Sequence, residues 1–220
     1  MIKAALFDMD GLLFDTEGLG LKVGVEVGSE IGYPVTMEMG RKLLGVNEAE
    51  STKYLQQFFP DLDGDDMWRR YAQKMKAHVE KDGTPLKKGC AEIITALGEK
   101  GIPYAIVSSS SRHVIDHYLS HSPLENAFPV IVSGDLGLKS KPAPDCFLKG
   151  AELLGVDIRD CCVLEDSLSG LKAGRAAGAH TIMVPDIIPY GEMHKGLCDY
   201  VAEDLFDALK HILEETCSLL

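Results

Sequence analysis

The fold is decided at residues 3–11, which read KAALFDMDG. Residues 3–7 form a short, mostly apolar run, which is typical of a strand buried on both faces of a parallel sheet. The run leads directly into an acidic, glycine-containing segment that begins with Asp8 and Asp10. This pattern predicts a first strand that carries chemically useful side chains at its carboxyl end.

Helix and strand patterns alternate from residue 85 to the end of the sequence. The first helix pattern puts Cys90, Ile93, Ile94 and Leu97 on one face and has Gly101 after it. Strands are then predicted near 103–107, 129–132, 161–164 and 180–184, and helices near 112–120, 144–154, 168–177 and 205–215. This alternation predicts an α/β fold, a doubly wound parallel sheet with a Rossmann-like core.

Residues 16–83 interrupt the alternation, because they lack strand patterns and carry helix signals. The signals are a capping box and a four-residue apolar spacing, at Asn47 with Glu50 and at Met67, Tyr71 and Met75. We therefore expect a catalytic core domain at 1–15 and 84–220, with a small α-helical cap domain inserted at 16–83. An insertion that returns to the point where it left the sheet can rock as a lid.

The chain has 220 residues, a formal net charge of −12 and a pI of about 5.0. Nucleic acids and anionic membranes bind surfaces with clustered Lys and Arg, so neither is an expected partner. A phosphate group would have to be captured locally, by a few donors in one site.

Six cysteines occur without any CxxC pair, and Cys161 and Cys162 lie inside a predicted strand. We interpret them as buried thiols of a reducing compartment and not as a disulfide framework or a zinc site. The N-terminal segment has neither a cleavage signal nor an apolar run long enough to span a membrane. The expected location is the cytoplasm.

Four polar clusters follow predicted strands or lie beside helix starts, where open α/β sheets bind ligands. In the first cluster, Asp8 and Asp10 are two apart in an extended chain, so both carboxylates point the same way. One carboxylate can attack while the other moves protons. The second cluster is the serine run 108–111, whose N–H groups, hydroxyls and following helix N-terminus suit a phosphate group.

The third cluster is centred on Lys141, within SKPAPD at 140–145, where prolines stiffen the backbone and hold the ammonium in place. The fourth is Glu165 with Asp166. Carboxylate oxygens of Asp8 and Asp166, with a backbone oxygen and waters, are suitable hard ligands for Mg²⁺. Together the clusters supply a nucleophile, an acid/base, cations and phosphate donors, as phosphoryl transfer requires.

Each cluster alone also has a purely structural interpretation. Acidic pairs and serines are common turn and capping residues, and a lone lysine is usually a solvated charge. The functional interpretation is favoured because one sheet would bring all four clusters together. We interpret the histidines at four-residue spacing as one helix face and not as a metal site: His113, His117 and His121.

The chain closely resembles the haloacid dehalogenase superfamily, in the helical-cap subgroup that includes β-phosphoglucomutase-like phosphatases and phosphohexomutases. Four segments carry the resemblance in the family's order: FDMDGLLFDTE at 7–17, VSSSS at 107–111, SKPAPD at 140–145 and LEDSLSG at 164–170. The resemblance covers essentially the whole chain and implies a Mg²⁺-dependent enzyme. Because Asp10 is present, the chain looks unlike the superfamily's true dehalogenases.

The resemblance implies a role for each matching residue. Asp8 would be the nucleophile that forms an aspartyl-phosphate, and Asp10 would be first the acid and then the base. Ser108 and the backbone at Ser109 would hold the phosphate, and Lys141 would bridge the phosphate and the nucleophile. The implied Mg²⁺ ligands are Asp8, the backbone carbonyl of Asp10, Asp166 and, directly or through water, Glu165.

Two positions in the inserted segment depart from the family's sugar-phosphate mutase. This chain has Gly20 where the mutase carries a histidine, and Glu48 where the mutase carries a phosphate-gripping arginine. A mutase must hold a second phosphate while its intermediate reorients, and a carboxylate has the wrong charge for that task. Arg41, Arg69 or Arg70 could substitute for the arginine.

The expected function is therefore hydrolysis of a small phosphorylated metabolite, such as a sugar phosphate, and the alternative is a phosphohexomutase of the β-phosphoglucomutase type. A phospho-acceptor receiver module is a third candidate, but such modules are shorter and lack a large insertion after the first strand. A monomer is expected because the lid must move.

Glycines are frequent at the start of the inserted segment, at Gly18, Gly20, Gly24 and Gly28. Each costs a helix about 1 kcal/mol relative to alanine. Close helix packing and room for substrate or hinge motion are equally good explanations.

Overall fold

The computed structural model describes residues 1–44, 46 and 48–217. The chain divides into two compact units, which are described separately. The first unit comprises Met1–Asp15 and Thr84–Leu220, and the second comprises Thr16–Gly83. Asn47 of the predicted capping box lies outside the described residues.

The first unit is built on a six-stranded sheet in which every strand pair is parallel. The strands are β1 Ala4–Phe7, β2 Tyr104–Val107, β3 Val130–Val132, β4 Cys161–Glu165, β5 His180–Met183 and β6 Tyr200–Val201. Their order in the sheet is β3-β2-β1-β4-β5-β6. The predicted doubly wound α/β fold is confirmed.

The strand order reverses direction beside β1. From β1 the chain adds β2 and β3 on one side, and it then crosses back to add β4, β5 and β6 on the other. Leu6 is accordingly paired with Ala105 on one side and with Val163 on the other. A reversal of this kind opens a crevice at the carboxyl ends of the two strands that flank it, and ligands of open α/β sheets bind there.

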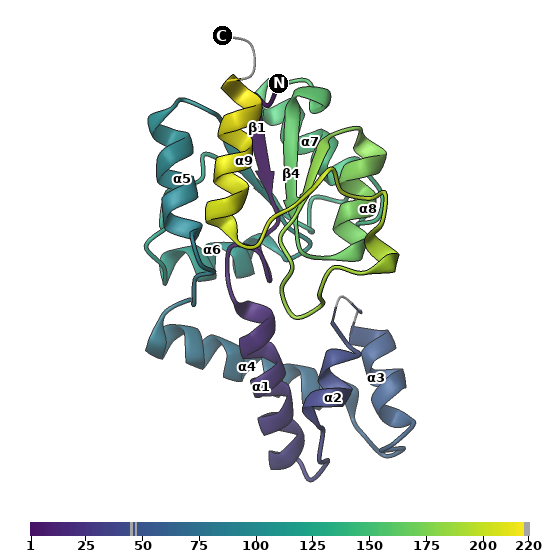
Figure 1. Ribbon diagram of the computed structural model, residues 1–220. Helices are drawn as coiled ribbons and strands as arrows, with labels where there is room; N and C mark the ends of the chain where they lie inside the picture. Colours follow the sequence, from purple (N-terminus) through teal and green to yellow (C-terminus); the bar gives the residue numbers. More distant parts are fainter. Residues whose placement is uncertain (45, 47, 218–220) are drawn as a thin grey trace. The chain divides into compact units, whose positions relative to one another are not determined.

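Helices cover both faces of this sheet (Figure 1). They are α5 Cys90–Glu99, α6 Arg112–Ser120, α7 Asp145–Leu154, α8 Leu168–Ala177 and α9 Leu205–Cys217, with short 3₁₀ helices η1 Ile158–Asp160 and η2 Glu192–His194. Helices α7 and α8 pack together on one side, and α5 and α9 pack together on the other. The apolar face predicted for α5 is buried as expected.

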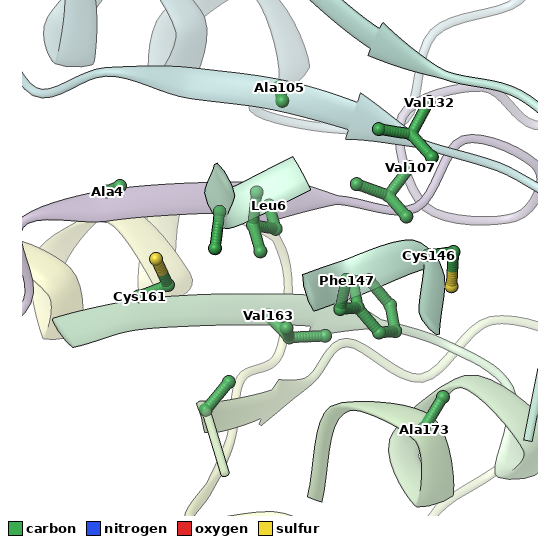
Figure 2. Close-up of a cluster of buried hydrophobic side chains, with 12 residues drawn as sticks. Ala4, Leu6, Ala105, Val107, Val132, Cys146, Phe147, Cys161, Val163 and Ala173 are labelled. Atoms are coloured by element: carbon green, nitrogen blue, oxygen red, sulfur yellow. The ribbon is translucent and has the colours of Figure 1, made fainter. Parts of the chain in front are cut away.

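The core between the sheet and α7 follows from strand alternation (Figure 2). Leu6, Val107 and Val163 are fully buried and come from three adjacent strands, where they face Phe147 of α7. Gly150 lets α7 approach closely, because a Cβ there would lie 3.0 Å from side-chain atoms of Leu6 and Val107. This close packing fixes the strand ends from which the polar clusters extend.

The described residues of the second unit form helices joined by loops and no strand. It contains α1 Thr16–Glu30, α2 Met37–Arg41, α3 Glu48–Gln56 and α4 Gly64–Asp82. Its own core is formed by side chains such as Val23, Val27, Leu55, Met67 and Met75. Two separate apolar cores explain why the chain divides at this segment.

The glycines of α1 differ in their surroundings. A Cβ at Gly28 would overlap Val35, and a Cβ at Gly20 would overlap the Tyr71 hydroxyl, so close packing explains both positions. Nothing lies within 4 Å of a Cβ at Gly24. Packing inside the unit therefore explains part of the glycine content but not all of it.

The segments that lead into and out of the second unit are paired with each other inside the first. The Asp15 N–H donates to the Pro85 carbonyl and the Lys87 N–H donates to the Leu13 carbonyl, both at 2.9 Å. Phe14 and Leu86 form an antiparallel bridge between these bonds. The two connections thus leave the first unit side by side, and this pairing is a property of the first unit alone.

Two further expectations concern thiols and membranes. Cys90, Cys146, Cys161 and Cys162 are buried, Cys198 is half-buried, and all five are free thiols. Among the described residues, no helix combines the length and the hydropathy needed to cross a bilayer.

The edge strand β6 has two residues and was not predicted, because so short a run shows no periodicity.

Shortening Leu6 to alanine tests the core. Leu6→Ala should lower the free energy of unfolding by about 2–5 kcal/mol, because it leaves a cavity against α7. Leu153→Ala on the exposed side of α7, where the leucine is 47% exposed, should change it by less than about 0.5 kcal/mol. Urea unfolding of both variants measures the difference, and equal effects would contradict this account of the core.

Candidate active site

The predicted site residues lie at the carboxyl ends of three adjacent strands. Asp8 follows β1, Ser108 follows β2, and Glu165 ends β4. The ladder of backbone hydrogen bonds continues into these residues, since the Asp8 N–H donates to the Leu164 carbonyl at 3.1 Å and the Ser108 N–H donates to Val132 at 2.9 Å. The sheet therefore fixes the backbone from which each polar side chain extends.

Lys141 joins two of these strand ends. Its Nζ donates to Asp8 Oδ1 at 2.5 Å, to Glu165 Oε1 at 2.6 Å and to the Val107 carbonyl at 3.1 Å. The ammonium also lies 5.0 Å from the centre of the Phe147 ring. The lysine side chain is 5% exposed, so it uses all three of its donors inside the protein.

Glu165 is held on both of its oxygens. Oε2 accepts hydrogen bonds from the backbone N–H of Ser167 at 3.1 Å and from its hydroxyl at 2.9 Å, while Oε1 faces Lys141. The carboxylate occupies the space beside Gly170 in the first turn of α8, where any Cβ would overlap it. A glycine is therefore required at this position for Glu165 to keep its place.

The serine run forms a turn beside Asp10. The Ser110 hydroxyl donates to Asp10 Oδ2 at 2.8 Å, and the Ser110 N–H donates to the Ser108 hydroxyl at 3.0 Å. Ser108 is buried and the Ser109 side chain is exposed. The turn leads into α6, so N–H groups and hydroxyls gather next to the two aspartates, as a phosphate site needs.

The electrostatics of the site are dominated by burial. Burial raises the pKa of Asp8 to about 8, and the Glu165 and Asp10 carboxylates add to the effect against the opposing charge of Lys141. Burial by itself favours the neutral amine of Lys141, but Asp8 and Glu165 outweigh it and raise the lysine pKa. One fixed ammonium thus faces several acids, and an additional cation would stabilise their ionised forms.

The side chains present fit a hard divalent cation. Carboxylate oxygens of Asp8, Glu165 and Asp166 all lie within 4.8 Å of one another. Gly11, with φ of 82°, leaves room beside Asp166, because a Cβ there would overlap the Asp166 carboxylate. Oxygen donors with excess negative charge suit Mg²⁺. Since both oxygens of Glu165 are engaged, Asp8 and Asp166 are the better direct ligands.

The structure thus brings together Asp8, Asp10, Ser108, Lys141, Glu165 and Asp166, with the backbone of Ser109 in the same turn. Sequence reasoning missed the roles of Ser110, Ser167 and Gly170, although all three lie within the quoted segments 107–111 and 164–170. The His117 and His121 rings contact each other, with centroids 4.5 Å apart, and neither belongs to an acidic or metal-type cluster among the described residues. Gly20 and Glu48 belong to the other unit.

Comparisons with known proteins show which family and which solved structures this chain is similar to. The family model described as haloacid dehalogenase-like hydrolase matches residues 5–184. A solved structure of a HAD family hydrolase from Deinococcus radiodurans, with bound phosphate and sodium, has a TM-score of 0.83 and 28% identity, and the match covers 97% of this chain and 96% of that one.

Two curated proteins are similar in sequence. Hexitol phosphatase B from Escherichia coli K12 is 31% identical over 187 residues, which cover 84% of each chain. The protein SUPPRESSOR OF QUENCHING 1, chloroplastic, from Arabidopsis thaliana is 35% identical over 83% of this chain, but the match spans only 18% of the plant protein's length.

Filling the space beside Glu165 tests how tightly the site is packed. Gly170→Ala should destabilise the protein by about 1–3 kcal/mol, because the new methyl group must displace the carboxylate that pairs with Lys141. Gly98→Ala in α5 should instead stabilise it by about 0.5–1 kcal/mol, since its Cβ would make only an ordinary contact, 3.7 Å from the Tyr104 hydroxyl. Denaturant unfolding distinguishes them, and a neutral or stabilising Gly170→Ala would contradict the contact.

Proposed function

We propose that this chain, which belongs to the haloacid dehalogenase-like hydrolase family and is a phosphoric monoester hydrolase, acts on a small phosphorylated metabolite. The proposed substrate is a sugar phosphate or a similar phosphomonoester, and the proposed cofactor is Mg²⁺. The observation that supports this most directly is the buried Lys141, which holds Asp8 at the carboxyl end of the central strand. A carboxylate kept in a fixed orientation by an ammonium is prepared to attack an anionic phosphorus centre.

The proposed reaction has two steps on Asp8. A carboxylate oxygen of Asp8 attacks phosphorus, the bond from phosphorus to the ester oxygen breaks, and Asp10 gives its proton to the leaving oxygen. Asp10 then takes a proton from water, whose oxygen attacks the aspartyl-phosphate and releases phosphate and the free Asp8 carboxylate. The Ser110 hydroxyl, 2.8 Å from Asp10 Oδ2, keeps the acid/base pointed toward this site.

The remaining site residues hold the phosphoryl group. Ser108 and the backbone at Ser109 are proposed to donate to its oxygens, while Lys141 bridges these oxygens and Asp8. Asp8, the backbone carbonyl of Asp10 and Asp166 are proposed to hold Mg²⁺, with Glu165 acting through water. When bound, the ion supplies positive charge that lets the anionic nucleophile approach an anionic phosphate.

The proposed substrate class rests on two supports. Hexitol phosphatase B is named for phosphorylated sugar alcohols, and this chain is 31% identical to it. The second unit would act as the cap that selects the leaving group, while the first unit handles the phosphoryl group. The cytoplasmic location and the monomeric state stay predictions.

The alternative is a phosphohexomutase, which needs a firm grip on a second phosphate. Glu48 is exposed at the start of α3, and Gly20 is buried against Tyr71 in the core of the second unit. Neither residue can supply the positive charge that would hold a second phosphate. Hydrolysis therefore remains the better supported activity.

Replacing the nucleophile tests the mechanism. Asp8→Asn should abolish phosphate release, because an amide oxygen is too weak a nucleophile, while the circular dichroism spectrum should remain that of a folded protein. The assay uses Mg²⁺ and a panel of sugar phosphates, hexitol phosphates and nucleotides, with phosphate and isomerised product measured together.

Asp160→Asn is the matched control, since Asp160 pairs with Lys3 just before β4, at the end of the strands away from the site. That variant should keep full activity. Undiminished turnover by Asp8→Asn would refute the aspartyl-phosphate mechanism, and isomerisation faster than phosphate release would establish the mutase instead.

Metal binding should depend on pH in a defined direction. Because Asp8 must be ionised to bind Mg²⁺ and its pKa is raised to about 8, the Kd should fall by about tenfold per pH unit from pH about 6 to 7 and level off above the pKa. Titration calorimetry in two buffers of different ionisation enthalpy should also detect released protons. The Asp8→Asn variant should lose this pH dependence, and a pH-independent wild-type Kd would contradict the proposal.

A further inference from the structure

Asp186 is a buried carboxylate that the proposed mechanism does not use. Its side chain is 8% exposed, and it lies three residues beyond the end of β5, in the same unit as the site. Oδ1 pairs with the ammonium of Lys87, but Oδ2 is buried and has no hydrogen-bond partner in the described protein. A carboxylate oxygen buried without a donor is costly, so a ligand or water is expected to supply one.

The unpartnered oxygen of Asp186 lies near Gly11 and Asp166 of the candidate active site. Oδ2 would lie 3.2 Å from a Cβ on Gly11, and the same Cβ would overlap the Asp166 carboxylate. A carboxylate oxygen of Asp166 and one of Asp186 lie within 4.8 Å of each other. Only the absence of a side chain at Gly11 keeps this space open.

We propose that Asp186 is a positioning residue for the metal, which accepts a hydrogen bond on Oδ2 from a water molecule bound to the Mg²⁺ held by Asp8 and Asp166. This inference rests on the proposed function. A hydrated Mg²⁺ keeps several of its waters, and each such water has protons to donate to a nearby carboxylate. The bond would satisfy the buried oxygen and orient the water at the same time.

Lys87 orients the Asp186 carboxylate and also belongs to the paired segments that lead to the second unit. Its ammonium engages Oδ1, so the other oxygen is directed at the space beside Asp166. Its backbone N–H donates to the Leu13 carbonyl, in the paired segments that lead to the second unit. The same short segment therefore carries both a connection of the inserted unit and the cation that sets Asp186.

A purely structural role for the Lys87–Asp186 ion pair predicts a different effect on metal affinity. A structural pair would contribute to stability and would not change the affinity for a metal. Lys88 offers a matched comparison, because it is the next residue and forms an ion pair with Asp204, 2.6 Å long, whose lysine is 76% exposed. Only the pair that includes Lys87 has an unpartnered buried oxygen facing the site among the described residues.

The test is calorimetric titration of the purified full chain with MgCl₂ alone, without substrate, so that the readout does not depend on turnover. Asp186→Asn should raise the Kd for Mg²⁺ by at least about tenfold. Lys87→Met should also raise the Kd, by about threefold, because Asp186 loses the ammonium that orients its carboxylate. The loss of a positive charge alone would change the Kd in the opposite direction. Lys88→Met should leave the Kd within about twofold of the wild type.

The outcomes separate this inference from the proposed function. Suppose that the wild type binds Mg²⁺ and that Asp166→Asn does not. If the folded Asp186→Asn variant then binds Mg²⁺ as tightly as the wild type, Asp186 has no role at the metal and the inference is overturned. If the wild type binds no Mg²⁺, the proposed metal dependence fails first. Should Asp186→Asn fail to fold, Lys87→Met decides: weaker binding supports the inference, and unchanged or tighter binding overturns it.

Discussion

The burial of the Lys141 ammonium between Asp8 and Glu165 is the constraint on which the rest of the site depends. An ion in a protein interior is tolerated only when its partners and its remaining donors are all satisfied, and removal of one partner typically costs about 3–5 kcal/mol. Lys141 meets this condition with two carboxylates and the Val107 carbonyl. The contacts of Lys141 therefore link the carboxyl ends of β1, β2 and β4 to one another.

This constraint extends into the helices that pack on the sheet. Glu165 can face Lys141 only because Ser167 donates to its other oxygen and because Gly170 leaves space for the carboxylate. One turn further along α8, a Cβ at Gly174 would lie 3.0 Å from Val163 and 2.8 Å from Thr181. The small residues of α8 thus serve two purposes, close packing on the strands and room for a buried acid.

The two connections to the inserted unit form a short paired segment inside the first unit. Both connections lie beside the loop that carries Asp10 and Gly11, and hydrogen bonds of Asp15 and Lys87 hold them together. These hydrogen bonds fix the backbone of the first unit on both sides of the insertion. The ion pair between Lys87 and Asp186 ties the same segment to the loop after β5.

The sequence by itself determined the α/β class, five of the six strands and the polar clusters that follow them. Parallel strands buried on both faces appear as continuous apolar runs, and the polar clusters directly follow them, so local pattern was sufficient. Only the tertiary structure decided which side chains meet. Lys141 pairs with Asp8 across 133 residues and Ser110 with Asp10 across 100, and the partners of Glu165 and Asp186 depend on strand order and on space left by glycines. Local periodicity carries no information about such distances, because they arise when separate elements pack against one another.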